Sequence, residues 1–273
     1  MLDVRPSPIA GTWYEGNAKS LTHSVDEYLN QAQLPELDGE VVGVIAPHAG
    51  HRYSGAVAGY AFAALRNLKP ELVAVVSPFH NIAEYPLLTT AHAAYGTPLG
   101  TIEVDKAALD ELKLNLDIPI TPVFADKEHS LEIELPFLQR ALSSDFKLLP
   151  IMVRRQEMGV AKKLGFALAK VIKDKNALLV ASTDLSHFYD QATANMLDAE
   201  MLRRFELFDP EAIFEAEWTG EAFACGHGAV AAVLWAAREL GANKVQVLRH
   251  ATSGDVTGDY SSVVGYGAAV ILR

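Results

Sequence analysis

The stretch VVGVIAPHAG, residues 41–50, contains a short apolar run that leads directly to a histidine, and related runs occur twice more. The three runs and the polar residues that follow them are 41–46 with His48, 72–76 with His80, and 178–181 with Asp184 and His187. Short β-branched runs bounded by Pro, Gly or Ser are typical of buried strands. Ligands of open α/β sheets bind beyond the carboxyl ends of the strands. We therefore expect these side chains to share one cleft.

Strand-like and helix-like segments alternate along the 273 residues, with no repeat and no linker. Half of the residues are hydrophobic and 21% are charged, as in an ordinary globular protein. Alternation of this kind predicts an α/β fold. We expect a single domain over residues 1–273, with a mostly parallel central sheet and helices on both of its faces.

The pattern also predicts individual elements. Asn17 is expected to cap a helix with an apolar stripe from Leu21 to Ala32. Further helices are expected at 56–65, 106–112, 126–142, 157–172, 193–205, 210–217 and 229–240. Further strands are expected at 87–91, 101–104, 147–153, 177–181, 245–248 and 263–272, the last two as an antiparallel pair. AGHRYSG (49–55) and YGTPLG (95–100) are expected to be a loop and a turn, and Pro136 to kink its helix or reset its start.

Charge and cysteine content limit the partners and the compartment. The net charge of −11 argues against nucleic acid or an anionic membrane as a partner. A single cysteine excludes an internal disulfide and fits a reducing compartment. The first residues lack a signal-peptide core, and no apolar run approaches the roughly 20 residues of a membrane span. We expect a cytoplasmic protein.

His48 and His80 are the first two candidate metal ligands. Pro47 favours an extended backbone before His48, and the glycines after it allow a tight loop that directs the ring into the cleft. Histidine is the commonest metal ligand, and two strand-end histidines reinforce each other. The alternative is a loop histidine bonded to backbone. His51 is either a supporting residue or simply exposed.

Asp184 and His187 lie three residues apart in STDLSHF (182–188). On a helical turn they would face the same way, so the carboxylate would orient the imidazole or take part in acid–base chemistry. The alternative is that Thr183 or Asp184 caps a helix. We favour a functional role, because polar clusters at buried strand ends usually have one.

His129 and Glu132 are spaced to share one face of the helix expected at 126–142. A histidine among carboxylates retains its proton to higher pH, which suits acid–base catalysis. A solvated acidic face explains the pattern equally well.

Cys225 precedes an apolar helix and is followed by Gly226 and Gly228. At a helix N-terminus the dipole would lower the pKa of the thiol and favour the thiolate, which is both ligand and nucleophile. The alternative is an inert buried cysteine. His227 is a possible partner of the thiol.

Six segments in this order and spacing resemble the MEMO family, also called AmmeMemoRadiSam system protein B in prokaryotes. They are RPSPIAGTWYEG (5–16), IAPHAGHRYSG (45–55), SPFH (77–80), DKEHSLEIELPFLQ (126–139), STDLSHF (182–188) and ACGHGA (224–229). The resemblance covers nearly the whole chain. It implies a fold similar to that of class III extradiol dioxygenases, which are non-haem iron enzymes.

The resemblance also implies site residues. It implies a metal site of His48, His80 and Cys225, flanked by Asp184 and His187, with His129 as a supporting residue. In the dioxygenases a carboxylate stands where the family has the cysteine. This chain departs from the usual pattern at His51, where an aromatic residue is more common, and at HGA (227–229), where Arg and Pro are more common.

The residues and the resemblance together predict a non-haem metal-dependent oxidoreductase. Two histidines and a thiol suit Fe(II) or copper, with zinc also possible, and not magnesium or calcium. The acid–base candidates are His187, Asp184 and His129. The alternative is a non-catalytic peptide-binding or assembly protein that retains a degraded cleft, and a third reading is a hydrolase that uses zinc-bound water or Cys225. The expected ligand is a small molecule or a peptide, and self-association is left open.

Overall fold

Four parallel strands form the centre of the structure, a computed structural model that describes residues 2–273. Their order is β2 (Val41–Ala46), β9 (Ala177–Ser182), β3 (Leu72–Pro78) and β8 (Lys147–Val153). Almost every residue in these strands is buried, as expected for parallel strands covered on both faces. The parallel α/β core predicted from the sequence is confirmed.

Strands of mixed direction extend the sheet on both sides. Next to β2 lies the antiparallel β12 (Val263–Leu272), which also pairs with the antiparallel β11 (Lys244–Thr252) and β10 (His187–Tyr189). Next to β8 lies the antiparallel β4 (Leu87–Thr90), followed by β7 (Ile120–Val123). A separate small sheet contains β1 (Val4–Arg5), β5 (Ala94–Thr97) and β6 (Gly100–Glu103). The predicted antiparallel pair at the C-terminus is confirmed.

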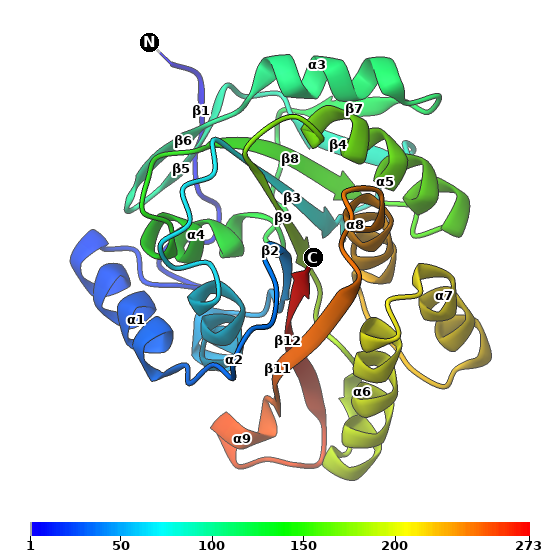
Figure 1. Cartoon of the computed structure of the whole chain (residues 1–273). Coiled ribbons are helices and arrows are strands. Elements are labelled where there is room, and N and C mark those ends of the chain that lie inside the picture. The colour runs from blue at the N-terminus through cyan, green and yellow to red at the C-terminus, as the bar shows by residue number, and fades with distance from the viewer. Residues whose placement is uncertain (1) are drawn as a thin grey trace.

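Helices cover both faces of the large sheet (Figure 1). One side carries α1 (Ala18–Gln31), α2 (His51–Ala63) and α4 (Leu135–Ala141). The other carries α5 (Met158–Ile172) and α8 (His227–Glu239), beside α6 (Gln191–Glu206) and α7 (Pro210–Thr219). The shorter elements are α3 (Lys106–Asn115), α9 (Gly254–Thr257) and the 3₁₀ turn η1 (Glu132–Glu134).

The start of α1 shows how local sequence fixes an element. The Asn17 side chain accepts hydrogen bonds from the backbone N–H groups of Lys19 and Ser20, as the sequence predicted. The stripe of Leu21, Val25 and Leu29 is buried against the core. Capping and periodicity agree at this helix, so it is read correctly from sequence.

Two predicted elements near the site are wrong. Residues 126–131 are not helical, and only η1 and α4 follow them, because Pro136 sits in the first turn of α4 and sets its start. The segment AGHRYSG is not wholly a loop, because α2 begins at His51, directly after Gly50. At 126–131 the helical pattern is overridden by tertiary contacts of Asp126 and Glu128, which are described below.

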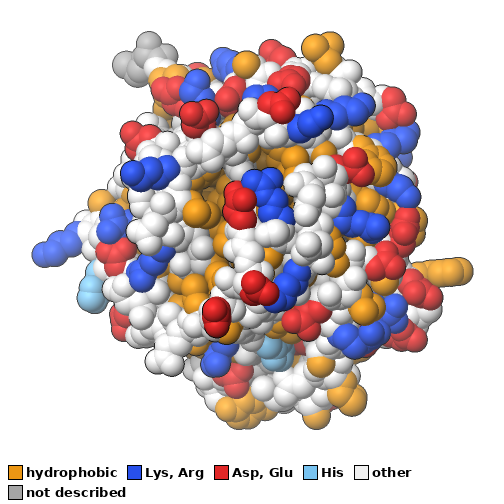
Figure 2. All heavy atoms as spheres, in the orientation of Figure 1, with side chains coloured by type: hydrophobic (Ala, Val, Ile, Leu, Met, Phe, Trp, Pro, Cys, Tyr) orange, Lys and Arg blue, Asp and Glu red, His pale blue; other side chains and the backbone are white. Residues whose placement is uncertain are grey.

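The described part of the chain contains no helix that combines the length and apolarity needed to cross a bilayer. Lys and Arg side chains are interspersed with Asp and Glu on the face shown in Figure 2, and positive charge does not gather there. This face therefore offers no extended basic surface of the kind that binds a nucleic-acid backbone.

Candidate metal centre

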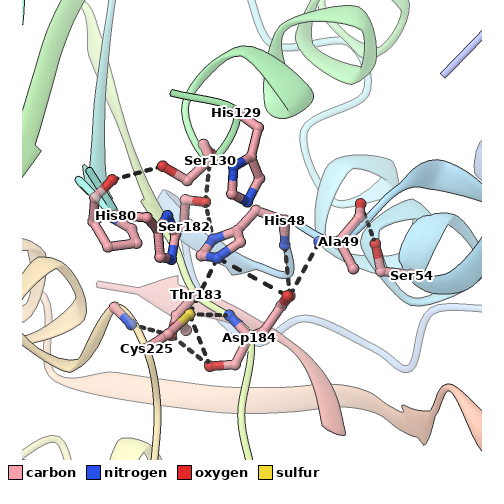
Figure 3. Close-up of polar contacts among 12 residues, drawn as sticks. His48, Ala49, Ser54, His80, His129, Ser130, Ser182, Thr183, Asp184 and Cys225 are labelled. Carbon is pink, nitrogen blue, oxygen red and sulfur yellow. Dashed lines mark hydrogen bonds and ion pairs between the residues drawn. The ribbon is translucent and has the colours of Figure 1, made fainter. Parts of the chain in front are cut away.

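Three histidines from distant parts of the chain converge beyond the carboxyl ends of the central strands (Figure 3). His48 follows β2, His80 follows β3, and His129 comes from the irregular segment before η1. Each offers a ring nitrogen, and these three atoms lie within 4.8 Å of one another. Among residues 2–273, these three form the one group of His, Cys, Asp or Glu side chains in which at least three are close enough to share a metal ion.

The hydrogen bonds of His48 determine which of its nitrogens is free. The Ser182 hydroxyl donates to the backbone oxygen of Ser130 at 2.7 Å, so its oxygen is left to accept. His48 Nδ1, 2.9 Å from that hydroxyl oxygen, therefore carries the proton and donates it. The lone pair of Nε2 is then available on the opposite side of the ring, as metal ligation requires.

Glu128 fixes the other two histidines. Its carboxylate accepts hydrogen bonds from His80 Nδ1 at 2.9 Å and from the backbone N–H groups of His80, His129 and Ser130. His129 Nδ1 also lies 3.1 Å from the same carboxylate. Burial would raise the pKa of Glu128, but the bonds and charge of His80 lower it to about 2. A permanently ionised carboxylate thus orients both rings.

Desolvation favours the neutral imidazole at His48 and His129. Burial, followed by the proximity of His129 and His80, holds the pKa of His48 well below its usual value. Burial also lowers the pKa of His129 to about 4, although Glu128 opposes the effect. The sequence-based expectation that nearby carboxylates keep His129 protonated is therefore wrong, because desolvation outweighs their attraction.

A buried arginine supports the segment that carries His129. Arg5 donates through Nε to Asp126 at 2.8 Å, through Nη1 to Glu132, and through Nη2 to the backbone oxygen of Glu128 at 2.9 Å. Glu132 also accepts the Tyr14 hydroxyl at 2.7 Å. Glu132 therefore shares no exposed helix face with His129. Neither Arg5 nor Glu128 was singled out from sequence, because the partners of Arg5 and the His80 partner of Glu128 lie far away in the chain.

Cys225 lies against His48 but outside the three-histidine group. Its Sγ is 3.1 Å from His48 Nε2 and accepts the backbone N–H of Asp184 at 3.3 Å. Gly226 permits this approach, since a Cβ there would lie 2.4 Å from the backbone oxygen of Ser182. Burial and the Asp184 carboxylate raise the pKa of the thiol. The expected lowering by the helix dipole is not observed.

Asp184 lies beside His48 and Cys225. One carboxylate oxygen accepts the backbone N–H groups of His48 at 2.8 Å and Ala49 at 3.2 Å, and the other lies 3.9 Å from His48 Nε2. Burial raises the pKa of Asp184 to about 7 despite these hydrogen bonds. The group can therefore exchange a proton near neutral pH.

His187 begins β10 and so does not share a helical turn with Asp184. Its Nδ1 donates to the backbone oxygen of Leu185 at 2.8 Å, which leaves Nε2 free. Burial and the neighbouring His80 lower the pKa of the ring. His187 is a neutral imidazole beside the cluster.

A buried carboxylate that the sequence did not reveal holds the strand end of His187. Asp198 accepts the backbone N–H of Ser186 at 2.9 Å and a hydrogen bond from His250 Nε2 at 2.8 Å. It lies against Gly265, where a Cβ would come within 1.9 Å of its carboxylate. Gly265 therefore leaves room for the Asp198 carboxylate, which holds the backbone next to His187.

Two further histidines considered from the sequence, His51 and His227, lie outside the cluster. His51 is buried, and its Nε2 lies 3.1 Å from the backbone oxygen of Ile133, a geometry that fits a packing role. His227 places one ring nitrogen 3.0 Å from the backbone oxygen of Gln156 and the other 3.4 Å from Glu217. His227 therefore makes these contacts rather than contacting the thiol of Cys225.

Comparisons with known proteins identify the family. Residues 5–270 match the family model of the Memo-like protein. The chain is 36% identical to a MEMO1 family protein of Nitrosopumilus maritimus, covering 97% of this chain and 98% of the relative. It is 32% identical to one from Pyrobaculum aerophilum (99% of each chain) and 34% identical to one from Thermotoga neapolitana (98% and 99%). The chain belongs to the Memo-like protein family.

Proposed function

We propose that this protein is a non-haem metal-dependent oxidoreductase whose ion is held by His48, His80 and His129. The convergence of three ring nitrogens within 4.8 Å carries the proposal. It is supported by the hydrogen bonds of His48 Nδ1 with Ser182 and of His80 Nδ1 with Glu128, and by His129 Nδ1, which lies 3.1 Å from the Glu128 carboxylate. Anchored, neutral imidazoles are the form of histidine that binds transition metals.

The donors indicate which ions fit. Imidazole suits iron, copper and zinc, whereas magnesium and calcium prefer oxygen ligands. Cys225 is proposed as an additional donor, because its sulfur already lies 3.1 Å from His48 Nε2. Its raised pKa means that the thiol must lose its proton on ligation, so binding through sulfur would be pH-dependent. The bound ion would supply Lewis acidity and, for iron or copper, one-electron redox chemistry.

Asp184 and His187 are proposed to handle protons. Asp184 has a pKa of about 7, which makes it suitable both as acid and as base. His187 has a free Nε2 and a lowered pKa, so it would act first as a base. His129 was also an acid–base candidate from sequence, and its place within the cluster leads us to propose it as a ligand instead.

Metal binding is tested with protein purified anaerobically and without chelators, then titrated with Fe(II), Cu(I) or Zn(II). We expect one ion per chain, and a loss of at least tenfold in affinity in His48→Ala, His80→Ala and His129→Ala. The exposed His23 gives the matched control, His23→Ala. Equal affinity in the cluster variants and the control would overturn the proposed site.

Cobalt substitution tests the role of Cys225. A sulfur-to-cobalt charge-transfer band that disappears in Cys225→Ser would establish sulfur ligation. A cobalt complex without that band, and with unchanged affinity in Cys225→Ser, would limit the ligands to the histidines.

The second candidate is a binding or assembly protein with a metal-free or inert cleft. It is favoured by the raised pKa of Cys225, since a protonated thiol is a poor ligand. The distinction is made by following oxygen consumption with a panel of catechols and hydroquinones. Metal-dependent turnover that is lost in His187→Ala supports the oxidoreductase, and the absence of turnover in a fully metal-loaded protein supports the binding protein.

A further inference from the structure

A groove lined by aromatic side chains borders the histidine cluster. Its walls include Trp13, Tyr53, Phe188 and Tyr266, and its volume is about 570 Å³. These residues come from the segment before α1, the first turn of α2, β10 and β12. We call this feature the aromatic groove. Its volume lies within the range of roughly 300–1,000 Å³ that is common for small-molecule sites.

The aromatic groove adjoins the proposed metal centre. Ala49 and Gly50, which follow His48 directly, form part of its lining. The Trp13 ring lines the groove and also packs on the His129 ring, with centroids 4.1 Å apart. A molecule in the groove would therefore lie beside the cluster.

Phe188 is the unusual residue of this groove. It has a φ of 64°, a left-handed conformation that is costly for a bulky aromatic residue. It lies where the pairing of β10 with β12 shifts register, between His187 and Tyr189. Its side chain is 76% exposed, so core packing does not explain the conformation. The strained bulge instead places an exposed aromatic ring at the groove, next to His187.

The lining also indicates the charge of the occupant. It contains no Lys or Arg side chain, and its one charged residue is Asp259. Hydroxyl groups are supplied by threonine and serine side chains, among them Thr12, Ser253 and Ser262. In a protein of net charge −11, this groove disfavours an anion and offers aromatic faces with a few hydrogen-bonding groups.

We propose that the aromatic groove binds an uncharged small molecule with an aromatic ring, and that Phe188 is the residue that determines its specificity. That the groove presents this molecule to a metal ion rests on the proposed function, whereas binding of the molecule in the groove does not. The bulge would hold the Phe188 ring in place for stacking before the molecule arrives, which lowers the entropy cost of binding.

The test uses the full chain, freed of metal with chelator, and isothermal titration calorimetry with 2-naphthol. We expect saturable 1:1 binding, at least tenfold tighter than that of 2-naphthoate, which carries a negative charge, or of decahydro-2-naphthol, which has no aromatic ring. Phe188→Ala should weaken 2-naphthol binding roughly twofold to tenfold, because one aromatic contact is worth about 0.5–1.5 kcal/mol. Trp218→Ala, at a 90% exposed aromatic residue on α7, is the matched control and should bind as wild type.

A second variant keeps the test independent of folding. Phe188→Gly removes the strain of the left-handed conformation, so we expect Tm to rise by about 2–4 °C while 2-naphthol binding weakens. The proposal is overturned by no saturable binding of 2-naphthol, by equal binding of 2-naphthoate, or by unchanged affinity in both Phe188 variants. Metal stoichiometry should be the same in Phe188→Ala and wild type, so loss of the groove and loss of the metal site are distinguished.

Discussion

Glu128 and Glu134 are both buried and lie six residues apart, yet their surroundings have opposite effects on them. Glu128 accepts four hydrogen bonds, from the His80 ring and three backbone N–H groups, and its pKa falls to about 2. Neither carboxylate oxygen of Glu134 has a hydrogen-bond partner of good geometry among the described residues, and only the nearby Ser182 hydroxyl favours its ionised form. Burial and Asp184 raise the pKa of Glu134 well above its usual value.

The difference shows that hydrogen-bond donors, and not burial alone, decide whether a buried carboxyl group is ionised. Glu128 stays ionised and aligns two histidines of the proposed centre. The raised pKa of Glu134 favours its neutral form. Four changes in or next to this segment sharpen the comparison.

The largest expected effect comes from Arg5, which joins the segment of Glu128 to the N-terminal strand. Arg5→Met would leave Asp126 and Glu132 buried without their cation. We expect a loss of about 3–5 kcal/mol in the free energy of unfolding, measured with urea. The exposed pair Arg140–Asp26 gives the control, because Arg140→Met should cost no more than about 1 kcal/mol. Equal costs would contradict the role assigned to Arg5.

Glu128→Gln should have the next largest effect. The amide keeps the size of the side chain but removes its charge and replaces an acceptor with a donor. We expect a cost of about 2–3 kcal/mol in urea unfolding and a tenfold to hundredfold loss of metal affinity, as for other residues that orient ligands. Unchanged metal affinity would show that Glu128 supports the fold only.

The metal-free protein should lose stability in acid through His129. Its pKa is about 4 in the folded state and 6.5 when unfolded, so the unfolded chain alone takes up this proton between those values. Stability should therefore fall by roughly 2 kcal/mol as pH drops from 6.5 to 4. Asp184, with its raised pKa, has the opposite sign: its contribution falls as pH rises from about 4 to 7.

Comparison with His129→Gln isolates the histidine contribution from that of Asp184. We expect the difference between the urea midpoints of the two proteins to be smaller at pH 4 than at pH 7. A constant difference would show that His129 is not desolvated.

Glu134→Gln should have the smallest effect, and of the opposite sign to Glu128→Gln. The folded state binds a proton on Glu134 that the unfolded state releases at neutral pH, so the acid costs stability there. We expect the amide to stabilise the protein by about 1 kcal/mol at pH 8 and by less at pH 5, measured by urea unfolding. Destabilisation at pH 8 would mean that Glu134 is ionised and paired.

The sequence predicted the central strands and the histidines at their ends, because hydrophobic runs and strand-end chemistry are local signals. His48 and His80 meet at the same edge of the sheet although β9 lies between their strands, β2 and β3. The irregular segment with His129 was not predictable, because its shape depends on Arg5 from the far end of the chain. The raised pKa of Cys225 was also not predicted. A helix N-terminus can be recognised in the sequence, whereas desolvation depends on the folded interior.

The central claim is that three histidines hold one ion. The X-ray absorption spectrum of the Fe(II)-loaded protein tests it most directly, with His129→Ala as comparison. We expect multiple-scattering features of three imidazoles in wild type, and of two in the variant with lower occupancy. A wild-type spectrum that lacks imidazole scattering, or one that is unchanged in His129→Ala at full occupancy, would contradict the claim.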